Sequence, residues 1–160
     1  MKKKVIAFIL GTLFGGIVGG VMVRHISNKR TLLWKEYSDK HLSMFLLMNE
    51  WIKIKQEKKN IKKYFETRGY KTIAVYGLSY IGERLIDELE ELGLEVKYGI
   101  DKKANKFYSD IEVYAPEDQL PMVDVIIVSA IYYFDEIKEL LEGKVNCPIV
   151  SLEDILYDIY

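Results

Sequence analysis

Short apolar runs alternate with segments of helical periodicity through residues 69–160. The predicted strands are Lys71–Tyr76, Glu95–Ile100, Ile111–Tyr114, Asp124–Ser129 and Pro148–Val150. Helices are predicted over Tyr80–Leu92 and Tyr132–Leu141, with a helical turn at Pro116–Leu120 and a last helix that starts at the capping-box-like Ser151–Asp154. This alternation is typical of a parallel sheet with right-handed crossovers. We therefore expect an α/β fold, a small doubly wound parallel sheet.

The N-terminal region carries an uncharged run of nineteen residues, Val5–Val23. At about 1.5 Å per residue, a helix of this length nearly crosses a hydrocarbon core of about 30 Å. The basic segment RHISNKR follows, without the small-residue cleavage site of a signal peptide. We therefore predict that residues 1–30 form an uncleaved transmembrane helix with basic flanks.

Glycines recur within this run at every fourth residue, at Gly11, Gly15 and Gly19. Such a ridge lets another transmembrane helix, or a second copy of the chain in a homodimer, approach closely. Glycine is also common in membrane helices without a specific partner, so both interpretations stay open. More basic residues follow the run than precede it, which predicts a single-pass protein of the cell membrane with a cytoplasmic globular domain.

Residues 31–68 form the predicted connection, two amphipathic helices ahead of the domain at 69–160. The first, about Thr31–Lys59, has no Gly or Pro and bears a wide apolar stripe: Trp34, Tyr37, His41, Met44, Met48 and Trp51. The stripe is too wide and short for a coiled-coil seam, so we expect it to pack on the globular domain or lie half on the membrane surface. Asn60 is expected to cap the second helix, and Gly69 to end it.

Charge and residue counts exclude several function classes. Residues 1–30 carry six basic and no acidic residues, whereas residues 69–160 carry eight basic and nineteen acidic residues. An acidic domain is unsuited to nucleic acid. Cys147 is the only cysteine, and His25 and His41 both precede the domain. A disulfide, a Cys-rich or His-based metal centre and a Ser-His-Asp triad are therefore excluded for the domain.

The loop after the first predicted strand carries most of a dinucleotide-binding pattern. Gly77, Ser79 and Gly82 occupy the positions of the three glycines of that pattern, between a strand and a helix. Asp101 ends the next strand, nineteen residues beyond Gly82, where an acid accepts hydrogen bonds from a ribose diol. We therefore predict that NAD or a related nucleotide binds at Gly77, Ser79, Tyr80, Ile81, Gly82 and Asp101, with its phosphate at the helix start.

Ser79 is the departure from the pattern, since its Cβ can crowd a diphosphate while its hydroxyl can donate to one. The alternative is a loop without a ligand, in which Gly77 serves a turn and Gly82 serves helix packing. Ser129 and Ala130 extend the candidate site, because ligands of open parallel sheets lie beyond the carboxyl ends of the strands. Ala130 is small and leaves room there.

Four segments resemble a known family: YGLSYIGERLIDEL, YGIDKKA, DIEVYAPEDQLPMVDVIIVSA and CPIVSLEDIL. They are similar to the small NAD(P)/CoA-binding-like Rossmann module at the front of bacterial polysaccharide-biosynthesis proteins and nucleotide-sugar-processing enzymes. The resemblance covers residues 69–155. It implies a Rossmann-like fold and a nucleotide site at Gly77, Ser79, Gly82 and Asp101, of which Ser79 departs from the family pattern.

No catalytic residue and no metal ligand is predicted. The Tyr-x-x-x-Lys of short-chain epimerases and dehydratases occurs in the domain only as Tyr98–Lys102, across the end of a strand. The leading hypothesis is a membrane-anchored, non-catalytic nucleotide-binding or docking module, associated with bacterial surface-polysaccharide or nucleotide-sugar metabolism. The alternatives are an NAD(P)-dependent oxidoreductase or epimerase completed by a partner, and a scaffold with an empty crevice.

Overall fold

The computed structural model describes residues 2–104 and 111–159, with the side chains of residue 27 and of residues 29 onward. The chain divides into two compact units, Met1–Leu42 and Ser43–Tyr160. The predicted anchor Val5–Val23, with its glycines, lies outside the residues whose side chains are described. Within the described part of the chain, no helix is long and apolar enough to cross a membrane.

A single helix, α1 (Lys2–Gln56), replaces the two helices expected before residue 60. The chain has no Gly between Gly20 and Gly69 and no Pro before Pro116, so nothing in the sequence interrupts the helix. In the first unit, the rings of Tyr37 and His41 are in contact along α1, with centroids 4.0 Å apart and planes tilted by 39°. His41 is exposed there, and not at the core or its boundary as its stripe position suggested.

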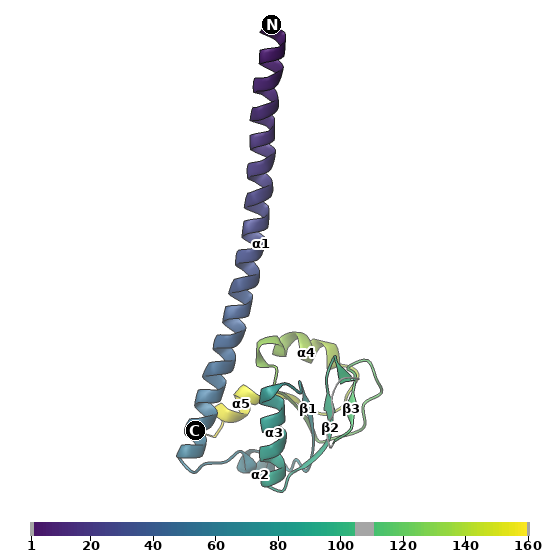
Figure 1. Cartoon of the computed structure of the whole chain (residues 1–160). Coiled ribbons are helices and arrows are strands. Elements are labelled where there is room, and N and C mark those ends of the chain that lie inside the picture. The colour runs from purple at the N-terminus through teal and green to yellow at the C-terminus, as the bar shows by residue number, and fades with distance from the viewer. Residues whose placement is uncertain (1, 105–110, 160) are drawn as a thin grey trace. The chain divides into compact units, whose positions relative to one another are not determined.

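The second unit is built on a five-stranded sheet, which confirms the predicted α/β fold (Figure 1). Its strands are β1 (Thr72–Tyr76), β2 (Glu95–Ile100), β3 (Val113–Tyr114), β4 (Val125–Val128) and β5 (Ile149–Ser151). Every pairing is parallel, and the spatial order is β3-β2-β1-β4-β5. This order reverses direction after β1, so the carboxyl ends of β1 and β4 flank the switch point where ligands bind in doubly wound sheets.

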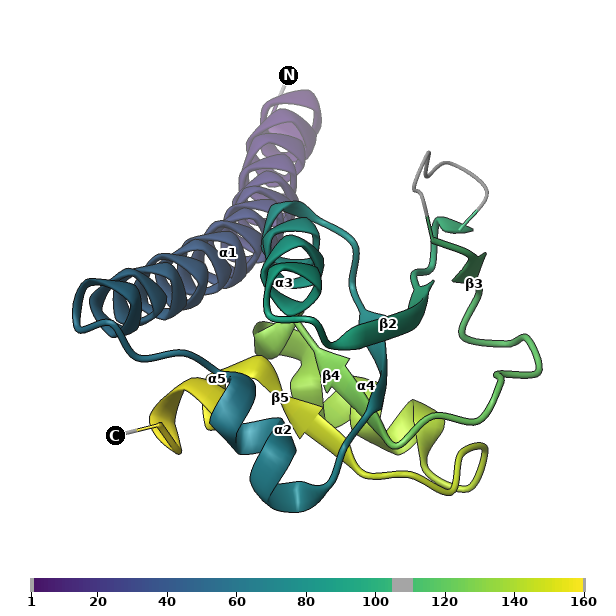
Figure 2. The ribbon, with the colours of Figure 1, turned by 90° about the horizontal axis from the view of Figure 1, so that it is seen from below.

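Helices cover both faces of the sheet (Figure 2). Successive residues of β1 and β4 are apolar and buried, so both faces of these strands must be shielded from water. Ile73 and Val75 of β1 face a core that contains α3 (Tyr80–Glu91), α2 (Lys62–Arg68) and α5 (Leu152–Tyr157). Ala74 and Tyr76 face the opposite core, which contains α4 (Phe134–Leu141). The 3₁₀ turn η2 (Ile131–Tyr133) leads from β4 into α4.

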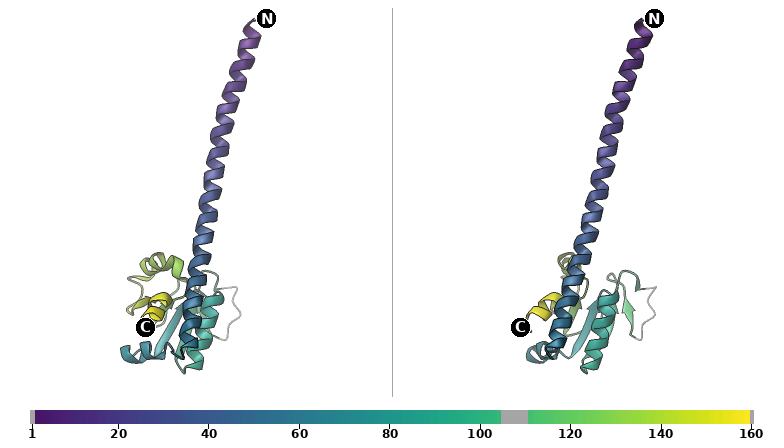
Figure 3. Two further views of the ribbon diagram at one scale, coloured as in Figure 1. Left: turned by 90° about the vertical axis from the view of Figure 1, so that its left-hand side faces the viewer. Right: turned by 60° about the vertical axis from the view of Figure 1, so that its left-hand side comes forward.

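The C-terminal part of α1 belongs to the second unit and buries one side against it. Leu47, Trp51 and Ile54 are in the same buried cluster as α3 and α5, and α5 lies beside this part of α1 (Figures 1 and 3). The indole Nε1 of Trp51 donates to Glu88 Oε2 of α3 at 2.5 Å, and Lys55 Nζ lies 3.1 Å from the same oxygen. Packing of the connecting helix on the domain is thus observed from Met44 onward.

The local capping signals are observed, and the expected helical turn is a single hydrogen-bonded turn. Asn60 Oδ1 accepts the N–H of Lys62 at 3.1 Å, and Ser151 Oγ accepts the N–H of Glu153 at 3.2 Å. Gly69 follows α2 with φ 72°. At Pro116–Leu120 a single turn is observed and not a helix: the N–H of Asp118 donates to Ala115 O at 3.0 Å, and Asp118 Oδ2 accepts the N–H of Ala115 at 2.7 Å.

Candidate functional site

The carboxyl ends of three adjacent strands bring the predicted site residues together. The N–H of Gly77 donates to Ile100 O at 2.8 Å, which joins the glycine loop to the end of β2. One residue beyond β4, the N–H of Ser129 donates to Tyr76 O at 2.9 Å. Asp101, Gly77 and Ser129 therefore follow β2, β1 and β4 side by side, as the pattern predicts for a site at this edge.

Gly77 and Gly82 are in close contact. Gly77 has φ 91°, a conformation that favours glycine, and a Cβ there would lie 2.9 Å from Ser129 Oγ. A Cβ on Gly82 would lie only 1.9 Å from Gly77 O. Both positions thus require glycine for backbone reasons, with or without a ligand.

Ser129 is tied to the glycine loop through its side chain. Its hydroxyl donates to Gly77 O at 2.6 Å, and the residue is buried. The hydroxyl proton of Ser129 is therefore used in this bond, which positions Gly77. Toward a ligand, the hydroxyl oxygen can only accept a hydrogen bond. Ala130 lies next to the same glycine, since its Cβ would be 3.2 Å from a Cβ on Gly77.

Asp101 holds the loop from the other side. Its Oδ2 accepts the N–H of Leu78 at 3.0 Å, and its Oδ1 accepts the N–H of Lys103 at 2.8 Å. Each carboxylate oxygen has further lone-pair capacity, so Asp101 can accept from a ribose diol without losing these bonds. The Leu78 side chain is buried and would lie 2.7 Å from a Cβ on Gly99, which explains the glycine in β2.

Ser79 begins α3 in an extended conformation, with φ −83° and ψ −173°. Its carbonyl accepts the N–H of Glu83 at 3.0 Å, but its hydroxyl makes no capping hydrogen bond. The hydroxyl therefore has its donor available beside the first N–H groups of α3, which have no partner within a helix. Tyr80 is 83 % exposed, whereas the Ile81 side chain is buried in the core and can offer only its backbone N–H.

Tyr76 is a residue of this edge that sequence reasoning missed. It ends β1 immediately before Gly77 and is 4 % exposed. Among the side chains that the structure describes, its hydroxyl is the one buried polar group without a hydrogen-bond partner. Burial raises the pKa of Tyr76, and the carboxylates of Asp101 and Glu117 add to this effect. In the sequence, Tyr76 is the last residue of an apolar run, and this pattern predicts a strand residue only.

Acidic residues surround the neighbouring hollow beyond β4 and β5. This hollow of about 410 Å³ is formed by η2, the start of α4 and the start of α5, and Asp135, Glu136, Glu153 and Asp154 line it. Four carboxylates repel a phosphate group. An anionic ligand at this edge is therefore favoured over β1 and β2, near Ser79 and Asp101.

The single cysteine of the chain lies away from the candidate site. Burial raises the pKa of the Cys147 thiol, which disfavours the nucleophilic thiolate. Cys147 lines a hollow of about 550 Å³ beside residues 117–123, before the start of β4 and β5 and away from the glycine loop. Within the described residues, no group of three or more His, Cys, Asp or Glu side chains is placed to hold a metal ion.

Comparisons of the chain with protein-family models, with curated proteins and with solved structures gave no match.

Proposed function

We propose that the chain is a membrane-anchored module whose Rossmann-like domain binds NAD or a related nucleotide at the Gly77 loop and performs no chemistry of its own. The observation that carries this proposal is the placement of Ser79. The Ser79 hydroxyl, which makes no capping hydrogen bond, and the first N–H groups of α3 lie at the same sheet edge as Asp101. One nucleotide can use both parts, with its phosphate at α3 and its ribose at Asp101.

The electrostatics of the loop set the expected affinity. Glu83 lies in the first turn of α3 and opposes a phosphate there, and Arg84 pairs with Asp87 at 3.0 Å. Ser79 and the backbone must therefore supply the phosphate contacts, which predicts weak binding. Asp101 favours an unmodified ribose and repels a 2′-phosphate, while Lys102 and Lys103 reduce this effect. We expect NAD to bind more tightly than NADP by a modest factor.

The membrane and pathway parts of the proposal come from the sequence. Val5–Val23 is uncharged and long enough to span a bilayer as a helix. The resemblance at residues 69–155 supports an association with bacterial surface-polysaccharide or nucleotide-sugar metabolism. The full-length chain should stay in the membrane fraction after alkaline extraction. Release of a shortened chain without residues 1–25 would show instead that this run is a cleaved signal.

Calorimetric titration of the full-length chain in neutral detergent tests the nucleotide site. The ligands are NAD, NADP, ADP-ribose, CoA, ATP and a UDP-sugar, and at least one of them should bind, with NAD ahead of NADP. A folded protein that binds none of them at millimolar concentration would leave the loop as a turn without a ligand. Turnover of a bound nucleotide sugar would favour the partner-dependent enzyme over a non-catalytic module.

A further inference from the structure

A second candidate site lies within the Ser43–Tyr160 unit, away from the glycine loop. A hollow of about 560 Å³ opens between the end of α1, helix α2 and the residues after α5. Lys58, Lys59, Asn60 and Lys63 line one part of it, and Asp158 lines another. We propose that this basic hollow binds a phosphate group, carried by a phosphate monoester or a diphosphate.

The lysines of the hollow differ from the other lysines nearby. Lys53 and Lys55 lie in the last turn of α1, where positive charge stabilises a helix, and Lys55 also pairs with Glu88. Lys58 and Lys63 come after this turn, and neither forms an ion pair within the described part of the chain. Both are exposed and reachable by a ligand. Their charges have no structural role comparable to that of Lys55.

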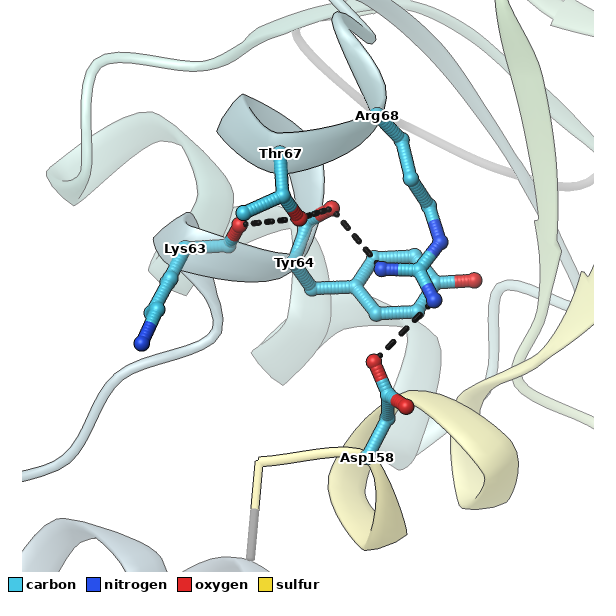
Figure 4. Close-up of polar contacts among 5 residues, drawn as sticks. All are labelled: Lys63, Tyr64, Thr67, Arg68 and Asp158. Atoms are coloured by element: carbon cyan, nitrogen blue, oxygen red, sulfur yellow. Dashed lines mark hydrogen bonds and ion pairs between the residues drawn. The ribbon is translucent and has the colours of Figure 1, made fainter.

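The acid in the hollow does not cancel these charges, because an arginine neutralises it. Arg68 lies 3.8 Å above the Tyr64 ring and donates to Asp158 Oδ2 at 3.1 Å (Figure 4). In the same view, the Lys63 ammonium group points away from Asp158. The other nearby acid, Glu57, lies 2.9 Å from Lys59. Lys58 and Lys63 therefore remain as the uncompensated charges.

The backbone at the end of α1 fixes where these lysines stand. Lys58 has φ 57° and is the only residue other than glycine with positive φ in the described chain. A lysine is unfavourable in this conformation, which glycine or asparagine usually occupies. Hydrogen bonds from Lys58 N to Lys55 O at 3.0 Å and from Lys59 N to Ile54 O at 3.1 Å close the turn. This turn places Lys58 and Lys59 next to Asn60 and close to the start of α2.

The available donors define the ligand class. Asn60 uses its Oδ1 to accept the N–H of Lys62, so its amide NH₂ remains a donor. Thr67 is different, because its hydroxyl donates to Lys63 O at 2.9 Å. Ammonium and amide donors without a competing acid suit a phosphate oxygen. The volume suits a ligand of sugar-phosphate size. A soluble phosphate compound and a lipid head group present the same chemistry.

Lysine acetylation of the full-length chain in phosphatidylcholine nanodiscs tests the proposal, with mass spectrometry as the readout. One sample contains no phosphate ligand, one contains inorganic pyrophosphate, and one has phosphatidic acid in the bilayer. We expect acetylation of Lys58 and Lys63 to slow by about fivefold or more in one ligand sample, while the exposed Lys97 and Lys138 are unchanged. Protection by pyrophosphate indicates a soluble ligand, and protection only by phosphatidic acid indicates a lipid head group. Equal rates in all samples, or equal protection of all four lysines, would overturn the proposal.

Two double variants give an independent check, because each removes two positive charges but from a different part of the surface. Lys58→Gln with Lys63→Gln should weaken binding of the ligand found above by about tenfold. Lys97→Gln with Lys138→Gln removes the same net charge elsewhere and should weaken it less than twofold. Equal losses in both double variants would mean that general charge attraction, and not this hollow, holds the phosphate. Binding at the Gly77 loop would be insensitive to both variants.

Discussion

Gly82 is packed against the carbonyl group of Gly77 so closely that a Cβ on Gly82 would lie 1.9 Å from that oxygen. The contact joins the first turn of α3 to the loop after β1. It fixes the direction in which α3 leaves the sheet, and with it the position of Ser79. The loop geometry therefore depends on a contact between two backbones, which no side chain can replace.

Gly82→Ala should lower the free energy of unfolding by about 3 kcal/mol or more, because the methyl group meets a backbone atom that cannot move aside cheaply. Gly93→Ala is the matched control. Gly93 has φ 73°, and nothing lies within 4 Å of its Cβ position, so only the backbone conformation is penalised, by about 1 kcal/mol. Urea denaturation of the two variants measures the difference. An equal loss in both would show that the Gly77–Gly82 contact is not as close as described.

Tyr76→Phe should stabilise the protein by about 1 kcal/mol, because it removes a buried hydroxyl that has no partner among the described residues. Tyr98 provides the comparison on the neighbouring strand. Its hydroxyl donates to Pro121 O at 2.6 Å, so Tyr98→Phe should cost about 1 kcal/mol. The melting temperatures of the two variants should therefore move in opposite directions. A loss of stability in Tyr76→Phe would mean that its hydroxyl has a bonding partner in solution.

The local part of this architecture follows from sequence pattern alone. The predicted strand Glu95–Ile100 is observed with the same bounds, and the helix after Ser79 ends one residue earlier than expected. Gly69 ends α2 as its residue type predicts, and Asn60 accepts the N–H of Lys62 in the turn before α2, whose N-cap position is Ile61. These features depend on neighbours within a few residues, so periodicity and capping rules describe them well.

Contacts between distant residues could not be predicted in this way. Trp51 and Glu88 are 37 residues apart, and no pattern pairs an indole with that carboxylate. Asp101 is expected from spacing to bind a ribose, but its bond to the N–H of Leu78 appears only once β1 and β2 are adjacent. At Pro116 the helical signal gave only one hydrogen-bonded turn, which ends at Asp118.

Asp124 gives the fold an acid-sensitive connection between β1 and β4. Its Oδ2 accepts the N–H of Thr72 at 2.7 Å, the N–H of Lys71 at 2.8 Å and the Thr72 hydroxyl at 2.9 Å. Hydrogen bonds from the Thr72 and Lys71 backbones, followed by that from the Thr72 hydroxyl, lower the pKa of Asp124 below its ordinary value of 3.8. A lowered pKa in the folded state means that the stabilisation is complete above pH 3.8 and is lost as the pH falls below it.

Asp124→Asn should therefore lower the melting temperature at neutral pH, and the difference from the unaltered protein should shrink as the pH falls through and below 3.8. Asp87→Asn is the control, because Asp87 is an exposed acid whose ion pair lies within α3 alone. Melting curves between neutral and acidic pH measure both variants. A difference for Asp124→Asn that stays constant with pH would contradict the assigned role of the carboxylate.

Ser79 decides whether the glycine loop is an open or an obstructed phosphate site, and two variants separate its hydroxyl from its Cβ. Ser79→Ala removes only the hydroxyl and should weaken NAD binding by roughly two- to tenfold, since that donor is not used in capping α3. Ser79→Gly removes the Cβ as well. The backbone at Ser79 has negative φ, so its conformation does not require glycine, and we expect the glycine variant to bind like the alanine variant. Tighter binding by Ser79→Gly than by the unaltered protein would identify the Cβ as an obstruction. Unchanged binding in both variants would mean that the phosphate does not contact the Ser79 side chain.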